Sequence, residues 1–405
     1  MTATAQAAPA AVSSDKGTYT YIAVFSAVLY TVLLIAPVIA GKLIEQFGLS
    51  PVQVGTLFSL ELGAFSLATV PAYLWLRRMN LRTASYIFTS VVIAGNVVSG
   101  FVDDFGLLMI ARVVTSLAAG SITVIILTLS GKTANPSRAF GIFVVFQLAM
   151  GALILAVFPS LFAGAGVSAI YWTLAGLAVL CLFVVNRIDG EVLRTAVPVA
   201  AEAAQRVPVL KAAAGMAAVL LFYIALSGIW SFIAQIAAGS GIDLSASSLV
   251  LSLATVAGIL SALVATALGE TPHRKLYLAV GYAGMAASIA LLFGSPALIQ
   301  FAVAAVIFKF AWTFILPYLL STLSSLSSGA HLMNTTNLMI GTGFSIGPIV
   351  SGALIQSGGG SFTGMLVFAL AGVLASCALV LIAQRRTTTE PGLTGVAGFW
   401  IAPAA

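Results

Sequence analysis

The stretch YTYIAVFSAVLYTVLLIAPVIAG, residues 19–41, contains no charged side chain. It is long enough to cross the hydrocarbon core of a bilayer as one helix, which takes about 20 mostly apolar residues. Comparable stretches follow along the whole chain, and the same criterion predicts about twelve membrane spans. Their expected cores are residues 19–41, 53–76, 84–101, 106–130, 139–163, 168–186, 213–237, 245–268, 276–293, 296–320, 331–356 and 362–384.

The composition excludes a soluble protein. Of the 405 residues, 60% are hydrophobic and only 7% are charged, and the mean hydropathy is +1.13. A soluble chain of this length would need a charged surface around its core. We therefore predict an all-α integral membrane protein. The first residues lack a compact apolar segment preceded by basic residues, so a cleavable signal peptide is not expected.

The longest polar interruption, residues 189–211, follows the sixth predicted span and divides the chain into two six-span halves. This division predicts an N-terminal tail, a first bundle, a central loop, a second bundle and a C-terminal tail. Their expected limits are residues 1–18, 19–188, 189–212, 213–386 and 387–405.

The net charge of +6 would fit a nucleic-acid partner if the basic residues formed a surface patch, but they lie in short loops. Lys and Arg in short loops are retained on the cytoplasmic side of a membrane. With the N-terminus inside, Lys42 is the only basic residue of a loop on the opposite side. We expect a bacterial inner-membrane protein with both termini in the cytoplasm, whose partner is the lipid bilayer and not nucleic acid.

A weak internal repeat supports the two halves. The sequence QLAMG, residues 147–151, parallels NLMIG, residues 337–341, and prolines follow at similar distances, at Pro159 and Pro348. Matching segments in corresponding spans are typical of transporters built from two related halves.

In span count, central loop and loop charge, residues 19–386 resemble the major facilitator superfamily (MFS). The segment YLWLRRMNLR, residues 73–82, resembles the basic turn that follows the family's second span, and TALGETPHRK, residues 266–275, resembles its counterpart. The fourth span, ARVVTSLAAG, resembles the family's R-x-x-x-G-x-x-x-G run at Arg112 and Gly120. The resemblance implies that the matching positions of the two turns hold the inner gate: Arg78, Arg82, Glu270, Arg274 and Lys275.

The resemblance also implies a monomeric secondary active transporter that works by alternating access, with a small-molecule substrate and no cofactor. Its first, fourth, seventh and tenth spans would line the central cavity, which places Arg112 and Lys309 on or near that cavity.

Ionisable groups inside a bilayer are costly, so each is a functional candidate, and the predicted spans contain Glu61, Arg112 and Lys309. Two cations favour an anionic substrate. Trp312 follows Lys309 by three positions and shares its helix face, which would suit an aromatic or amphipathic carboxylate, although such aromatic side chains also serve packing. Glu61 is the candidate proton-coupling group, alone or paired with Arg112. A permanent ion pair that only fixes helix packing is the alternative.

Other polar side chains near mid-span could orient a substrate or bond neighbouring helices: Tyr30, Ser227, Trp230, Ser231 and Asn337. The sequence has no His or Cys cluster with metal-ligand spacing, no phosphate-binding loop and no catalytic triad, so neither a metal site nor an enzyme is predicted. The leading hypothesis is a proton-coupled or otherwise gradient-driven carrier of an organic anion, with protons or another coupling ion as a further partner. Export of neutral amphipathic or drug-like compounds is the alternative, and a passive channel or a non-transporting receptor belongs to a different class.

Overall fold

The computed structural model of the chain describes residues 15–76, 78–162, 164–188, 209–269, 273–324 and 330–384. Both expected tails beyond these limits, most of the expected central loop, Arg77 and Glu270 lie outside the described residues. Within them every regular element is helical.

The helices of the first half are α1 (Lys16–Leu29), α2 (Thr31–Phe47), α3 (Pro51–Leu67), α4 (Thr69–Trp75), α5 (Leu81–Ser99), α6 (Phe105–Lys132), α7 (Pro136–Phe162), α8 (Val167–Leu182) and the short η1 (Val185–Arg187). Those of the second half are α9 (Val209–Gly239), α10 (Leu244–Leu268), α11 (Arg274–Ala290), α12 (Leu298–Ser324), α13 (Ala330–Ser357) and α14 (Thr363–Ala383).

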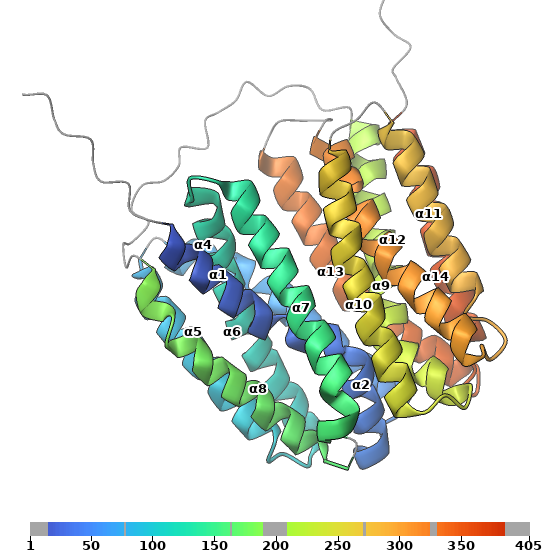
Figure 1. The fold of residues 1–405 in the computed structure, drawn as a ribbon, viewed down its shortest axis with the longest axis horizontal. Coiled ribbons are helices and arrows are strands. Elements are labelled where there is room, and N and C mark those ends of the chain that lie inside the picture. Colours follow the sequence, from blue (N-terminus) through green and yellow to red (C-terminus); the bar gives the residue numbers. More distant parts are fainter. Residues whose placement is uncertain are drawn as a thin grey trace, which may run out of the picture.

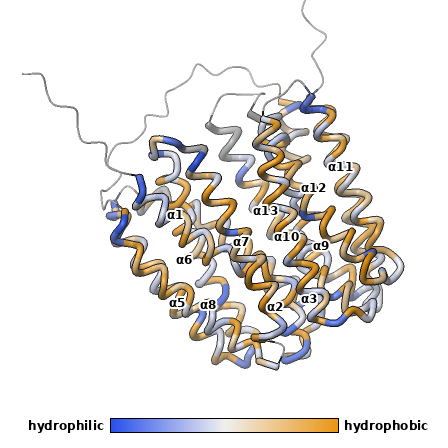
Figure 2. Tube along the Cα trace, in the orientation of Figure 1, coloured by the Kyte–Doolittle hydropathy of each residue, from blue (hydrophilic) through white to orange (hydrophobic). Residues whose placement is uncertain are grey.

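The predicted twelve-span, all-α fold is confirmed. Helices α1 and α2 form one span that is interrupted at Tyr30, and α3 and α4 form another that is interrupted at Ala68. The 14 α-helices of the described residues therefore make twelve spans. Eleven of these spans are long and apolar enough to cross a membrane, and the remaining one is α11, with 17 residues. Hydrophobic residues fill the middle of the helices and hydrophilic residues gather at their ends (Figure 2).

The two halves pack their helices in the same way. Helix α5 lies against α6 as α11 lies against α12, and α3 lies against α6 as α10 lies against α12. Likewise α1 contacts α7 as α9 contacts α13, and α5 contacts α8 as α11 contacts α14. The weak sequence repeat therefore corresponds to a repeated arrangement of helices, visible as two bundles in Figure 1.

The two ends of the molecule differ. We call the end that carries residues 15 and 384 the termini face. The opposite end, which we call the loop face, carries the short connections that follow α2, α5, α7, α9, α11 and α13. The bundles come together toward the loop face and diverge toward the termini face (Figure 1). Among the described residues, the main contacts between them are those of α3 with α13, α7 with α10, and α2 with α9.

Close contacts and hydrogen bonds hold the bundles together near the loop face. Gly55 of α3 lies so near Pro348 of α13 that a Cβ atom on Gly55 would collide with the Pro348 carbonyl oxygen. The Ser59 hydroxyl accepts a hydrogen bond from the Ile349 amide at 2.9 Å, and on the opposite side Ser252 donates to the Ala152 carbonyl at 2.7 Å. Small residues allow this backbone approach within a membrane.

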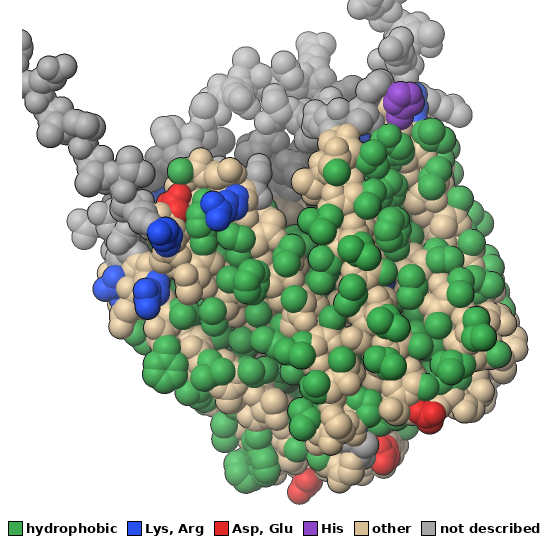
Figure 3. Space-filling view, viewed as in Figure 1, with side chains coloured by type: hydrophobic (Ala, Val, Ile, Leu, Met, Phe, Trp, Pro, Cys, Tyr) green, Lys and Arg blue, Asp and Glu red, His purple; other side chains and the backbone are tan. Residues whose placement is uncertain are grey.

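Acidic residues of the loop face act as helix caps. Asp104 accepts from the Leu107 amide at the start of α6, and Asp243 accepts from the Ala246 amide at the start of α10. Each bond satisfies an amide that has no partner within its helix. Figure 3 shows Lys and Arg side chains at the termini face and most of the visible acidic side chains at the loop face. Apolar side chains cover the surface between them, as expected for contact with lipid.

Candidate functional site

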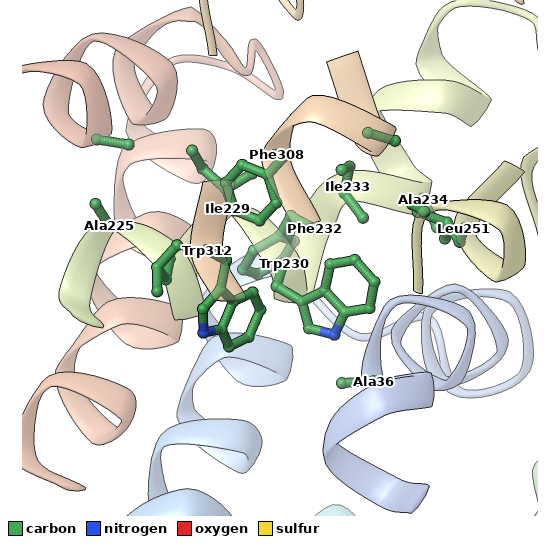
Figure 4. Packing of buried hydrophobic residues seen from close by; sticks show 14 of the residues in the cluster. Ala36, Ala225, Ile229, Trp230, Phe232, Ile233, Ala234, Leu251, Phe308 and Trp312 are labelled. Carbon is green, nitrogen blue, oxygen red and sulfur yellow. The ribbon is translucent and has the colours of Figure 1, made fainter. Parts of the chain in front are cut away.

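A buried lysine lies between two tryptophans in the second bundle. Lys309 of α12 is 1% exposed, and its Nζ atom lies 3.9 Å from the ring centroid of Trp230 on α9 and 3.9 Å from that of Trp312. The two indole rings meet nearly edge to face, with centroids 6.1 Å apart. Figure 4 shows both rings, with the indole nitrogen of Trp230 turned toward the helix that carries Ala36. Such contacts stabilise a desolvated cation by about 2 kcal/mol.

Neighbouring helices fix the stem of this lysine. A Cβ atom at Gly258 of α10 would lie 3.2 Å from Lys309 Cγ, so the absence of a side chain there makes room for the lysine. One turn further along α12, Thr313 donates a hydrogen bond to the Gly258 carbonyl at 3.0 Å. Across the part of the chain that the structure describes, no carboxylate lies within ion-pairing distance of Lys309. Among the described residues, the two indole rings are the groups that contact the Lys309 side-chain nitrogen.

A second charged cluster lies in the first bundle. Arg112 of α6 donates from Nε to Glu61 Oε1 of α3 at 3.0 Å, and its Nη2 donates to the same oxygen. Its Nη1 donates to Asn96 Oδ1 of α5 at 2.7 Å, and the guanidinium lies 4.7 Å from the ring centroid of Tyr171 on α8. Glu61 and Arg112 are 5% and 1% exposed. Both donors reach Oε1, so Oε2 takes part in neither of these bonds.

This cluster borders a cavity in the first bundle. Its lining is largely apolar and comprises Val28, Leu29, Tyr30, Val32, Leu33, Glu61, Leu62, Phe65, Val92, Asn96, Arg112, Thr115, Ser116, Ala119 and Leu174. Leu33 connects it to the lysine site, because the Leu33 carbonyl accepts a hydrogen bond from Trp230 Nε1 at 3.0 Å. The cavity and the lysine site are therefore neighbours, joined through Leu33 and Trp230 where the two bundles meet.

Comparison with known families agrees with this arrangement. The family model of the Major Facilitator Superfamily matches residues 20–336. The chain belongs to the major facilitator superfamily. Membership implies that this MFS protein is a multi-pass membrane transporter of small molecules.

Solved structures share the fold of this MFS transporter at low sequence identity. A mutant of the nucleoside transporter NupG has a TM-score of 0.72 at 13% identity, covering 91% of this chain and 100% of its own. A bacterial homologue of the human lysosomal transporter Spinster, inward-facing and occupied, has a TM-score of 0.65 at 15% identity, covering 94% and 100%. Its unoccupied inward-facing form has a TM-score of 0.65 at 14% identity, covering 91% and 97%. No curated protein matches the sequence.

The other expected substrate residues of the MFS transporter differ in their surroundings. Tyr30 borders the cavity, where its ring packs edge-on against Phe65. Ser227 and Ser231 are buried, and each hydroxyl donates to the carbonyl four residues earlier in α9 at 2.8 Å. These two serines bond the backbone of their own helix, and Ser227 also lies within hydrogen-bond distance of the Gly343 carbonyl of α13, at 3.2 Å. Asn337 is exposed on α13.

The expected gating residues that the structure describes, Arg78, Arg82, Arg274 and Lys275, lie at the termini face. Arg82 donates to the Ile188 carbonyl at 2.8 Å, and Arg274 donates to the Ser321 carbonyl at 3.0 Å. Arg78 and Lys275 are exposed, while Glu270 is outside the described residues.

Two members of the charged cluster are missing from the sequence-based candidates. Asn96 could have been found from the sequence, because it is the one amide side chain in the predicted span 84–101. Nothing in the sequence marks Tyr171, at the beginning of α8, as a member of the cluster. The contact between Trp230 and Lys309 was also not predicted, since these residues lie on helices far apart in the sequence.

Proposed function

We propose that this MFS protein is a secondary active transporter of small organic anions, in particular carboxylates with an aromatic or apolar body. The observation that carries the proposal is Lys309, a buried ammonium between Trp230 and Trp312 without a carboxylate partner among the described residues. An isolated charge in a low-dielectric interior is unfavourable by several kcal/mol. A bound carboxylate would supply the missing countercharge, and the aromatic walls would contact its apolar body.

Transport would follow from movement of one bundle relative to the other. The bundles are in contact near the loop face and diverge toward the termini face, which supports alternating access. The concentration of basic side chains at the termini face supports a cytoplasmic location for this face in a bacterial inner membrane. With that orientation, the described conformation would be open to the cytoplasm.

Proton coupling is assigned to Glu61 in this proposal. Arg112 from α6 is its one ionic partner among the described residues, and the ring of Tyr171 from α8 lies 4.7 Å from the Arg112 guanidinium. While Glu61 is ionised, it neutralises Arg112. A proton on Glu61 would leave Arg112 as a second uncompensated cation beside the cavity and so favour entry of an anion. Proton binding and anion binding would then strengthen each other, because such coupling is reciprocal.

The largely apolar cavity favours a second candidate, an exporter of neutral amphipathic compounds. Phe65, Val92 and Leu174 would contact such a compound without any need for a charge. In this alternative Lys309 would have a packing role, and transport would not depend on its charge.

Uptake into proteoliposomes tests the proposal. Purified protein should accumulate a radiolabelled aromatic carboxylate against its gradient when an inward proton gradient is imposed, and uptake should saturate. Uptake of a neutral amide of the same shape, with none of the carboxylate, would favour the second candidate. Passage of either compound only down its gradient would indicate a channel.

A further inference from the structure

We propose that Trp230 is a positioning residue that links occupancy of the lysine site to closure of the bundles at the loop face. Its indole N–H bonds the first bundle, and its indole ring holds the Lys309 ammonium. The inference rests on the proposed function only in taking the anion to bind at Lys309.

The first step concerns the helical hydrogen bond that Pro37 removes from α2. In an α-helix the carbonyl of residue 33 accepts a hydrogen bond from the amide of residue 37. Residue 37 is a proline within α2 and has no N–H group, so Leu33 lacks that donor. Trp230 Nε1 of α9 donates to this carbonyl at 3.0 Å, and Trp230 is 1% exposed. A donor from the second bundle therefore satisfies a carbonyl that the first bundle leaves open.

A second bond strengthens the same junction. Gln235 Nε2, further along α9 toward the loop face, donates to the carbonyl of Pro37 at 3.1 Å. Both bonds join α9 of one bundle to α2 of the other. For a solute to leave through the loop face these helices must separate, and both bonds must then break. Separation of the helices would leave the buried Leu33 carbonyl without a donor, and this cost favours the closed junction.

The second step concerns the ring of the same indole. The Lys309 ammonium lies 3.9 Å from its centroid and draws electron density from it, which makes the N–H a stronger donor to Leu33. An anion that pairs with the ammonium weakens this polarisation. Binding of the anion would therefore loosen the bond between Trp230 and Leu33 and favour opening of the loop face.

Trp312 provides the matched control. Its ring lies at the same 3.9 Å distance from Lys309, and it also packs among aromatic side chains. Among the described residues, however, no hydrogen bond from its indole N–H is resolved. Replacement of either tryptophan by phenylalanine keeps an aromatic ring, while only Trp230→Phe removes an interbundle hydrogen bond.

The test measures the distance between the bundles by electron–electron double resonance. Spin labels are placed on Ser160→Cys in α7 and Ser357→Cys in α13, both exposed near the loop face, after Cys181 and Cys377 are replaced by alanine. Without ligand, Trp230→Phe should raise the ratio of open to closed molecules about fivefold, as expected for one hydrogen bond, while Trp312→Phe stays near wild type. No change in Trp230→Phe, or equal changes in both variants, would overturn the link.

A double-mutant cycle tests whether Trp230 acts through the Leu33 carbonyl and not through a general effect of the substitution on folding. Pro37→Ala restores an amide that can bond Leu33, so Trp230→Phe should have less effect in the Pro37→Ala background than in wild type. An undiminished effect would mean that Trp230 does not act through Leu33.

Benzoate and benzamide test the dependence on the anion. Saturating benzoate should raise the open fraction of wild type but not of Trp230→Phe, and benzamide should change neither. Bound benzoate without any shift would refute the coupling. Absence of benzoate binding, measured separately by thermal shift, would refute the proposed anion site and the coupling, while the ligand-free comparison would still decide whether Trp230 holds the bundles together.

Discussion

Arg112 donates two hydrogen bonds to one carboxylate oxygen of Glu61, although the residues lie 51 positions apart on α6 and α3. Each side chain is buried, so the removal of either one leaves an unpaired charge inside the bundle. We expect Arg112→Gln to lower the free energy of unfolding by about 3–5 kcal/mol. The double variant Glu61→Gln, Arg112→Gln should recover part of that loss. Denaturant titration in detergent measures both, and a milder effect of the single variant than of the double would contradict the pairing.

The role of Glu61 in coupling can be separated from its role in stability. Glu61→Gln imitates the protonated carboxyl, so the variant should lose accumulation driven by a pH gradient and retain substrate exchange at equal pH. Transport in proteoliposomes measures the two activities. Loss of both in a poorly folded variant would instead assign Glu61 to helix packing, and retention of both would remove it from the mechanism.

The charge of Lys309 should determine anion affinity. Lys309→Gln removes the ammonium while keeping a polar side chain, and it should weaken benzoate binding about ten- to hundredfold, as expected for the loss of a charged hydrogen bond. Lys132→Gln is the control because Lys132 is exposed in the last turn of α6. Calorimetric titration provides the comparison. Equal benzoate affinity in Lys309→Gln and wild type would assign Lys309 to packing.

The contact between Gly55 and Pro348 should be required for closure of the loop face. Gly55→Ala introduces a Cβ atom that collides with the Pro348 carbonyl, which should destabilise the closed conformation by about 1–3 kcal/mol. Gly141→Ala is the matched control, because a Cβ atom on Gly141 of α7 would meet nothing within 4 Å. The interbundle distances described above report the result. Similar distances between the spin labels in the two variants would show that the contact between Gly55 and Pro348 does not hold the bundles together.

The orientation in the membrane predicts which loops react from outside. Single cysteines at Asp103, Gly164 and Gly359, in the loop-face connections, should react with an impermeant thiol reagent in intact cells. A cysteine at Ala200, in the expected central loop, should react only after the cells are opened. Labelling of Ala200 in intact cells would reverse the proposed orientation.

The sequence by itself determined the class, the two halves, the span count and the family. Crossing a bilayer depends on the apolar length of a segment, which can be read locally, as in residues 19–41. The same reasoning marked Glu61, Arg112 and Lys309, because an ionisable side chain within an apolar span is conspicuous wherever it lies. Trp312 was placed beside Lys309 from helical periodicity alone, and the two side chains are in contact.

Only the tertiary structure decided how these groups are partnered. Asn96 and Tyr171 complete the Glu61–Arg112 cluster from α5 and α8, and Trp230 reaches Lys309 from α9. Such contacts depend on the rotation and depth of each helix relative to its neighbours, which local periodicity does not specify. The hydrogen bond between Trp230 and Leu33 shows most clearly what the sequence alone does not determine. The sequence reveals that Pro37 removes a donor, but only the packing of α9 against α2 determines which side chain replaces it.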